Sequence, residues 1–386
     1  MAPWGPSRGT VRWPRYISPH QVRRTPGRTG RPTLPAGAQD RIDPAELVRA
    51  LRESGAAADD AELLSMSYAP IGVGHTADSF RVELRWSRQG AGPSSLVAKI
   101  PSVDEKSAGT AKQLGAYERE CRFYELLAPR TKVTTPRFLG AMEYDGERTG
   151  LLLEDLSGRA RPGNQLSDAP LEQVVLARRQ LVELQAPYWG NEATGASPWL
   201  HRRLGVPIPA IAERMARSWA TSRERIAGGF SREELAVVDR FVERAEDWTL
   251  SLDGPFSLVH HDFRFDNLLF SDSEVFVVDW QTVGWGPPMF DVAYLLGPSF
   301  GREVRTRCER EQIHRHMDEL AEAGVTDWTF DEAWEAYRKA SFAVLLMLVP
   351  PTGSVRRTDR GDAMFSRLIQ YGAQQVIDLD ALEFLS

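Results

Sequence analysis

Apolar residues alternate with polar ones, or form short apolar runs, over much of the first third of the chain, and they recur at helical spacing over most of the remainder. Alternation and short runs are typical of strands, and recurrence at three and four residues is typical of helices. The first pattern predicts strands near residues 66–71, 79–86, 96–100, 137–144 and 149–156. The second predicts helices near residues 44–54, 110–127, 170–185, 208–226, 231–250, 291–296, 303–323, 330–348 and 362–377. The predicted fold class is therefore α+β, with a β-rich first lobe and a mainly helical second lobe.

Composition divides the chain into three segments. Residues 1–40 hold seven arginines and seven prolines, one acid and no periodic apolar pattern, which predicts a disordered basic extension because too little apolar surface can be buried. A basic arm for an anionic partner, or a transit peptide, is the alternative. The polar segment 157–164 predicts a boundary between a first lobe, residues 41–157, and a second lobe, residues 158–386.

Charge and cysteine content narrow the function classes. The net charge of −6 gives no reason to expect nucleic-acid binding by the folded part. There is no apolar run of about 18 residues, so no membrane span is expected. The two cysteines, Cys121 and Cys308, match no metal-ligand spacing, and a reduced, cytoplasmic compartment is expected.

One stretch concentrates polar side chains between short hydrophobic runs. Residues 258–280 read LVHHDFRFDNLLFSDSEVFVVDW, which predicts a loop with Asp262 and Asn267, two short strands, and Asp279 directly after the second strand. Carboxylate and amide oxygens suit Mg²⁺ and its bound phosphates. An aspartate followed five residues later by an asparagine is also the spacing used for phosphoryl transfer in kinase-like folds. Trp280 and Gln281 stand after Asp279 in place of the protein-kinase DFG continuation, which argues against a protein kinase.

Three upstream features fit the same chemistry. Gly72 and Gly74 lie between two predicted strands, as in a glycine flap over phosphates, although turn glycines are common. Lys99 lies in a short strand, where a lysine is most often an exposed edge residue. Glu120 lies at the edge of a predicted helical apolar face and is either an exposed helix residue or a partner of Lys99.

With these motifs in place, the sequence resembles the aminoglycoside phosphotransferase and choline kinase superfamily, which has a protein-kinase-like fold. The resemblance is carried by VHHDFRFDNLL at residues 259–269 and VDW at 278–280, and it extends from about residue 43 to the C-terminus. The segments LEDL at 153–156 and ECRFY at 120–124 look most like the ecdysteroid-kinase-like branch.

The resemblance implies a role for each matching position. Lys99 would contact the α- and β-phosphates of ATP, with Glu120 orienting it, and Asp262 would accept or orient the acceptor hydroxyl. Asn267 and Asp279 would hold Mg²⁺.

The same resemblance implies a hinge and a brace. Backbone groups near Glu154 and Leu156 would bind adenine, and Asp291 and His260 would brace the catalytic loop. His261 departs from the family, in which a small residue is usual, and it is expected either to narrow the loop or to add an acceptor contact.

The expected function is ATP- and Mg²⁺-dependent transfer of the γ-phosphate to a hydroxyl of a small molecule. Aromatic residues within 186–248 suggest a neutral, partly apolar acceptor, or else they are helix-packing core. Trp280 and Trp285 either line the site or pack under it. A nucleotide-binding pseudokinase scaffold is the alternative, disfavoured because every catalytic position is filled, and a protein kinase is a weaker one. The sequence sets neither the acceptor nor the oligomeric state.

Overall fold

The computed structural model describes residues 41–71, 77–144, 146–200, 211–355 and 357–385. The chain divides into two units, Met1–Asp43 and Pro44–Ser386. The second unit contains every element discussed below. The predicted disordered extension, residues 1–40, lies outside the described residues, and both it and the lobe boundary at residue 157 stay predictions.

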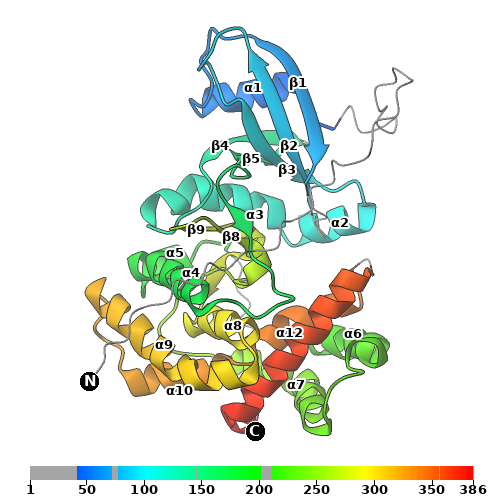
Figure 1. The fold of residues 1–386 in the computed structure, drawn as a ribbon, viewed down its shortest axis with the longest axis vertical. Helices are drawn as coiled ribbons and strands as arrows, with labels where there is room; N and C mark the ends of the chain where they lie inside the picture. The colour runs from blue at the N-terminus through cyan, green and yellow to red at the C-terminus, as the bar shows by residue number, and fades with distance from the viewer. Residues whose placement is uncertain (1–40, 72–76, 145, 201–210, 356, 386) are drawn as a thin grey trace, which may run out of the picture. The chain divides into compact units, whose positions relative to one another are not determined.

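The first half of the second unit is built on one antiparallel sheet (Figure 1). Its strands follow the order β1-β2-β3-β5-β4. Their bounds are Leu63–Pro70 for β1, Ala77–Trp86 for β2, Ser95–Pro101 for β3, Phe138–Tyr144 for β4 and Glu147–Glu154 for β5. All five predicted strands are confirmed to within a few residues.

Strand β3 is central, and its two faces differ as the alternation predicts. Leu96, Ala98 and Ile100 are fully buried on one face, whereas Val97 and Lys99 lie on the other face and are half-buried. Because β3 pairs with β2 on one side and with β5 on the other, Lys99 is not an edge residue. The interpretation of Lys99 as an exposed edge residue is therefore wrong.

The predicted single helix over residues 110–127 is wrong in one respect. The chain forms α2 (Glu105–Gln113) and α3 (Ala116–Arg122), followed by a wider π-helical turn at Phe123–Leu127. Gly115 separates the two helices with a left-handed φ of 63°, a conformation that glycine adopts without a Cβ penalty. Leu114, which lies within the predicted helix, is exposed at this break.

Helices dominate the chain after β5. Their bounds are Leu171–Gln185 for α4, Glu192–Gly195 for α5, Ile211–Ile226 for α6, Arg232–Ser251 for α7, Met289–Ser299 for α8, Arg302–Glu322 for α9, Phe330–Ala340 for α10, Ala343–Thr352 for α11 and Asp359–Asp378 for α12. Ser231 and Glu234 form a capping box at the start of α7. The predicted helix 330–348 is instead two helices, because the chain turns between α10 and α11. In the described residues, no helix is long and apolar enough to cross a bilayer.

Short strands carry the polar stretch among these helices. Their bounds are Ser257–Val259 for β7, Leu268–Phe270 for β8, Val275–Val277 for β9 and Gly284–Gly286 for β10. Strand β8 pairs with β9 and with a short strand, β6 (Arg161–Pro162), and β7 pairs with β10. The predicted order of loop, strand, turn and strand is confirmed. Since β7 and β9 are fully buried, the loops that follow them are fixed at one end.

Candidate active site

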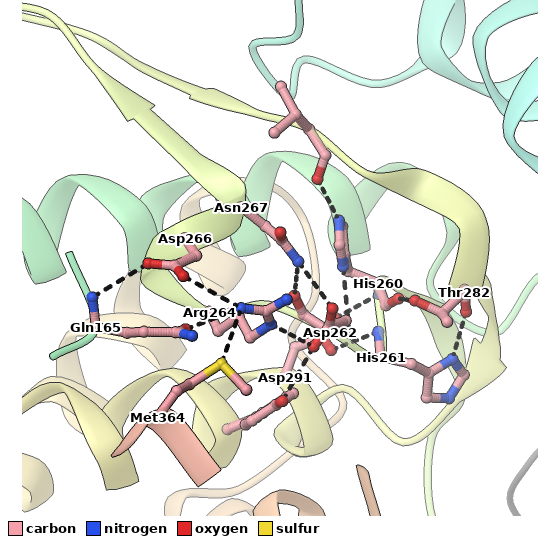
Figure 2. Close-up of polar contacts among 12 residues, drawn as sticks. Gln165, His260, His261, Asp262, Arg264, Asp266, Asn267, Thr282, Asp291 and Met364 are labelled. Carbon is pink, nitrogen blue, oxygen red and sulfur yellow. Dashed lines mark hydrogen bonds and ion pairs between the residues drawn. The ribbon is translucent and has the colours of Figure 1, made fainter. Parts of the chain in front are cut away.

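The loop after β7 is held by a carboxylate on α8. Asp291 is fully buried and accepts the backbone N–H groups of His260 at 2.6 Å and of His261 at 2.9 Å (Figure 2). Burial raises the pKa of Asp291 to about 7, although the two N–H bonds favour its charged form. The bracing role expected of Asp291 is confirmed by this geometry.

His260 braces the same loop through its ring. Its Nδ1 accepts the backbone N–H of Asp262 at 3.2 Å, so Nε2 carries the proton and donates to the Val278 carbonyl at 3.1 Å. Burial lowers the pKa of His260 below its ordinary value, which keeps the ring neutral and preserves this tautomer. The loop of Asp262 is thereby tied to the strand end that leads to Asp279.

His261 does not act as expected. Its backbone is left-handed, with a φ of 64°, which explains why a small residue suits this position. The side chain is fully buried, packs edge-on against Phe290 and bonds through Nδ1 to the Thr282 carbonyl at 2.9 Å. The buried ring is not available to an acceptor, so the predicted acceptor contact is wrong, whereas the predicted narrowing of the loop stays a prediction.

Asp262 follows with its carboxylate held by three donors. Arg264 Nε donates to Oδ1 at 2.9 Å, and Tyr294 donates its O–H to the same oxygen at 3.0 Å. Asn267 Nδ2 donates to Oδ2 at 2.9 Å and to the Asp262 carbonyl, also at 2.9 Å. The side chain of Asp262 is 20% exposed, so the carboxylate is fixed yet still reachable.

Asn267 and Asp279 are the residues that could hold a divalent cation. The amide of Asn267 uses its nitrogen on Asp262, which leaves Oδ1 as its acceptor atom. Burial works against the charge of Asp279, but the Lys99 ammonium outweighs it and lowers the pKa of this carboxyl. One ionised carboxylate and one amide oxygen fit a hard cation that takes its other ligands from phosphate and water. The described residues contain no cluster of three His, Cys, Asp or Glu side chains that would bind a metal without such help.

Lys99 brings the sheet and the polar stretch together. Its Nζ lies 2.8 Å from Glu120 Oε2 and 2.6 Å from Asp279 Oδ1. Burial opposes its charge, but Asp279 and Glu120 together raise the pKa of Lys99 above its ordinary value. Glu120 is buried at 3% exposure and is the partner of Lys99, which decides between the two interpretations of this residue.

A family model for the phosphotransferase enzyme family matches residues 67–338. The chain belongs to the phosphotransferase enzyme family. Among curated proteins, none matches it.

Solved structures share the fold of this phosphotransferase. One is a proposed aminoglycoside phosphotransferase of Ralstonia eutropha JMP134, 16% identical, with a TM-score of 0.50, covering 86% of this chain and 98% of its own. Another is a choline kinase of Cryptosporidium parvum Iowa II, 11% identical, with a TM-score of 0.50, covering 82% and 91% respectively. At these identities the likeness shows the fold alone, and it confirms the kinase-like α+β fold class. The ecdysteroid-kinase-like branch stays a prediction.

Helix α3 of the phosphotransferase is fastened to the polar stretch. Glu120 Oε1 accepts the backbone N–H of Trp280 at 3.1 Å. Arg119 is buried and donates to the carbonyls of Leu114, Gln281 and Trp199 at 2.7, 2.7 and 3.0 Å. Burial lowers the pKa of Arg119 to about 10, still well above neutrality. These contacts fix the position of Glu120, and through it the position of Lys99.

The structure describes only some of the residues that are expected to contact nucleotide. Gly72 and Gly74 lie outside the described residues. Glu154 ends β5, donates its backbone N–H to the Arg137 carbonyl at 2.9 Å and bonds Arg159 through its side chain. Leu156 is buried. The adenine-binding role of this segment stays a prediction.

The aromatic residues suggested for the acceptor are mostly packing residues. Tyr188 and Trp219 are 4% exposed, and Trp219 donates its indole N–H to Asp239 at 2.6 Å. Trp280 and Trp285 are also buried, so they pack under the loops. Trp280 stacks on Phe123 with ring centroids 3.7 Å apart. His201 lies outside the described residues.

Sequence reasoning missed Arg264, Tyr294 and Arg119. Arg264 stands two residues after Asp262 inside the recognised motif, which is a usable signal. Tyr294 stands three residues after Asp291, so both lie on one face of α8, yet a tyrosine in an apolar run is usually core. No local pattern marks Arg119.

Proposed function

We propose that this phosphotransferase moves the γ-phosphate of ATP, with Mg²⁺, to a hydroxyl group of a small molecule. The supporting observation is Lys99, whose ammonium bonds both Glu120 and Asp279. The Lys99 ammonium thus lies where the sheet meets the polar stretch that carries Asn267 and Asp279. Phosphates and Mg²⁺ would bind at this place. Family membership supports the reaction class.

In the proposed reaction the acceptor oxygen bonds to the γ-phosphorus, the bond to the β–γ bridging oxygen breaks, and ADP leaves. Asp262 accepts the hydroxyl proton and orients the oxygen for in-line attack. Lys99 holds the α- and β-phosphates, and Glu120 holds Lys99. Little covalent chemistry falls to the protein beyond this positioning.

Asn267 and Asp279 would hold Mg²⁺. When bound, the ion neutralises the charge that develops on the phosphate oxygens. The Lys99 contact uses Oδ1 of Asp279, so Oδ2 remains for the cation.

The acceptor is proposed to be uncharged or only weakly charged, such as a metabolite alcohol or a neutral antibiotic. A polycation would need spare carboxylates near Asp262. Asp262 itself is bonded by Arg264, and Asp266, in the same loop, is bonded by Arg360 at 3.0 Å. These carboxylates are already neutralised by arginines. We also propose a cytoplasmic location. Both cysteines are free thiols, as is usual in a reducing compartment, and ATP is supplied there.

A screen for ADP release tests the proposal. Purified protein with Mg·ATP is offered pools of alcohols, amino alcohols and antibiotics, and the Asp262→Asn variant runs alongside. The variant should lose turnover by roughly 10²–10⁴, the range for a positioned general base, while nucleotide binding survives. Equal turnover in both proteins would contradict the assignment. Binding of ATP without any turnover in the wild type would favour the scaffold alternative.

A further inference from the structure

The carboxylate of Asp262 is fixed by donors from two separate parts of the fold. Arg264 and Asn267 belong to its own loop, whereas Tyr294 reaches it from α8. We propose that Tyr294 is a positioning residue, whose O–H sets the plane of the Asp262 carboxylate for the acceptor hydroxyl. This inference rests on the proposed function of Asp262.

Without Tyr294 the Asp262 carboxylate would keep one donor on each oxygen, Arg264 Nε on Oδ1 and Asn267 Nδ2 on Oδ2. The terminal torsion of an aspartate is soft and roughly two-fold. Arg264 donates to Oδ1 through Nε, and its Nη1 is turned to Gln165 Oε1 at 3.0 Å (Figure 2). Arg264 therefore does not grip both oxygens of Asp262 as a fork. The Tyr294 hydroxyl is a second donor on Oδ1 at 3.0 Å and comes from outside the loop, so it restrains the rotation that the two donors within the loop still allow.

Helix α8 is suited to this task because it already holds the same loop by its backbone. Asp291 accepts the N–H groups of His260 and His261, and Tyr294 follows three residues later on the same face of the helix. Both side chains are fully buried. One rigid element thus positions both the backbone of the loop and the carboxylate that the loop carries.

A purely structural role for Tyr294 predicts a different effect of its substitution. If Tyr294 only satisfied its buried hydroxyl, its loss would weaken the fold and would add independently to any change at Asp262. If it acts through the carboxylate, its loss should have no further effect once the carboxylate is gone. A double-mutant cycle therefore separates the two roles.

The experiment uses the full chain with Mg·ATP and water as the acceptor, so that no acceptor needs to be known. Initial rates of ADP release are measured for the wild type, Tyr294→Phe, Asp262→Asn and the double variant. Phenylalanine keeps the ring and removes only the O–H. We expect Tyr294→Phe to lower turnover about tenfold, as for loss of a hydrogen bond to a charged group, with KM for ATP unchanged. In the Asp262→Asn background the same substitution should change nothing.

Tyr337→Phe is the matched control. Tyr337 is also fully buried, and its hydroxyl bonds Glu309 at 3.1 Å and Gln375 at 2.9 Å, far along the chain from the catalytic loop. Loss of this hydroxyl should lower the thermal midpoint and leave turnover unchanged. Wild-type turnover in Tyr294→Phe, or losses that multiply in the double variant, would overturn the inference. Equal rates in the wild type and Asp262→Asn would instead overturn the proposed function itself.

Discussion

Lys99 Nζ and Asp279 Oδ1 lie 2.6 Å apart although 180 positions separate the two residues in the chain. Glu120 completes the contact from α3. The ammonium is therefore held by two carboxylates that would repel each other without it. Its removal should affect both the phosphate contact and the spacing of those carboxylates.

Lys99→Met should weaken ATP binding at least about tenfold, because the proposed phosphate contact is lost and two negative groups remain beside it. Titration calorimetry with ATP measures this effect. Lys112→Met is the control, since Lys112 is exposed and pairs with Glu147 at 3.5 Å. Equal ATP affinity in Lys99→Met and the wild type would contradict the role given to Lys99.

Asp279→Asn should raise the Mg²⁺ concentration for half-maximal turnover by about tenfold or more, because the carboxylate proposed to hold the ion becomes a neutral amide. Turnover measured against Mg²⁺ at saturating ATP shows the shift. Asp272→Asn changes an exposed aspartate in the turn before β9 and should leave the Mg²⁺ curve in place. An unchanged curve for Asp279→Asn would remove this residue from the cation site.

His316 should make stability depend on pH. It is fully buried on α9 with Nε2 3.2 Å from Gln185 Oε1, and burial, together with nearby Arg178, lowers its pKa from 6.5 to about 3. Below pH 6.5 the unfolded chain binds a proton that the folded protein does not. The contribution of His316 to stability should therefore fall as the pH falls from 6.5 towards 3, by about 2 kcal/mol at pH 5.

Urea unfolding of the wild type and His316→Gln between pH 8 and 5 measures this contribution, because the stability of the wild type relative to the variant should fall by that amount. His314→Gln is the control, because His314 is exposed two residues earlier on the same helix and should keep the wild-type slope. Identical slopes for the wild type and His316→Gln would show that another group is responsible.

Arg119→Lys should lower the free energy of unfolding by about 2–4 kcal/mol, since lysine cannot reach three carbonyls at once and buried acceptors lose their donors. ATP affinity should fall with it, because Arg119 fixes the helix that carries Glu120. Arg122→Lys on the same helix is the comparison: Arg122 is exposed and pairs with Glu118, so little change is expected. Wild-type stability in Arg119→Lys would show that α3 is held by its apolar contacts alone.

The sequence was informative where the interaction is local. Spacing alone predicted that Asp262, Asn267 and Asp279 lie beside short hydrophobic strands, and the structure places them there; their roles stay predictions. Strand alternation placed Lys99 on the correct face of β3. The break at Gly115 was missed although a glycine is a known breaker, because a helical apolar pattern continues on both sides of it.

Interactions between residues that are far apart in the chain could not be predicted from a single sequence. The pairing of Lys99 with Glu120 was one of two open interpretations, and contact with Asp279 was not foreseen. The burial of His261 depends on Thr282 and Phe290, which are far from it in sequence. Tyr294 lay in an apolar helix, where its hydroxyl gave no sign of a partner.

The attachment of α3 has a mechanical consequence for nucleotide exchange. Three side chains of α3 and the turn after it contact the segment that follows Asp279. Arg119 donates to the Gln281 carbonyl and Glu120 accepts the Trp280 backbone N–H. Phe123 stacks on the Trp280 ring. The Lys99 ammonium is held by the carboxylates of Glu120 and Asp279. Because α3 also packs against β5, it is attached both to the sheet and to the segment after Asp279. A movement of the sheet relative to the later helices would therefore have to break one of these two sets of α3 contacts.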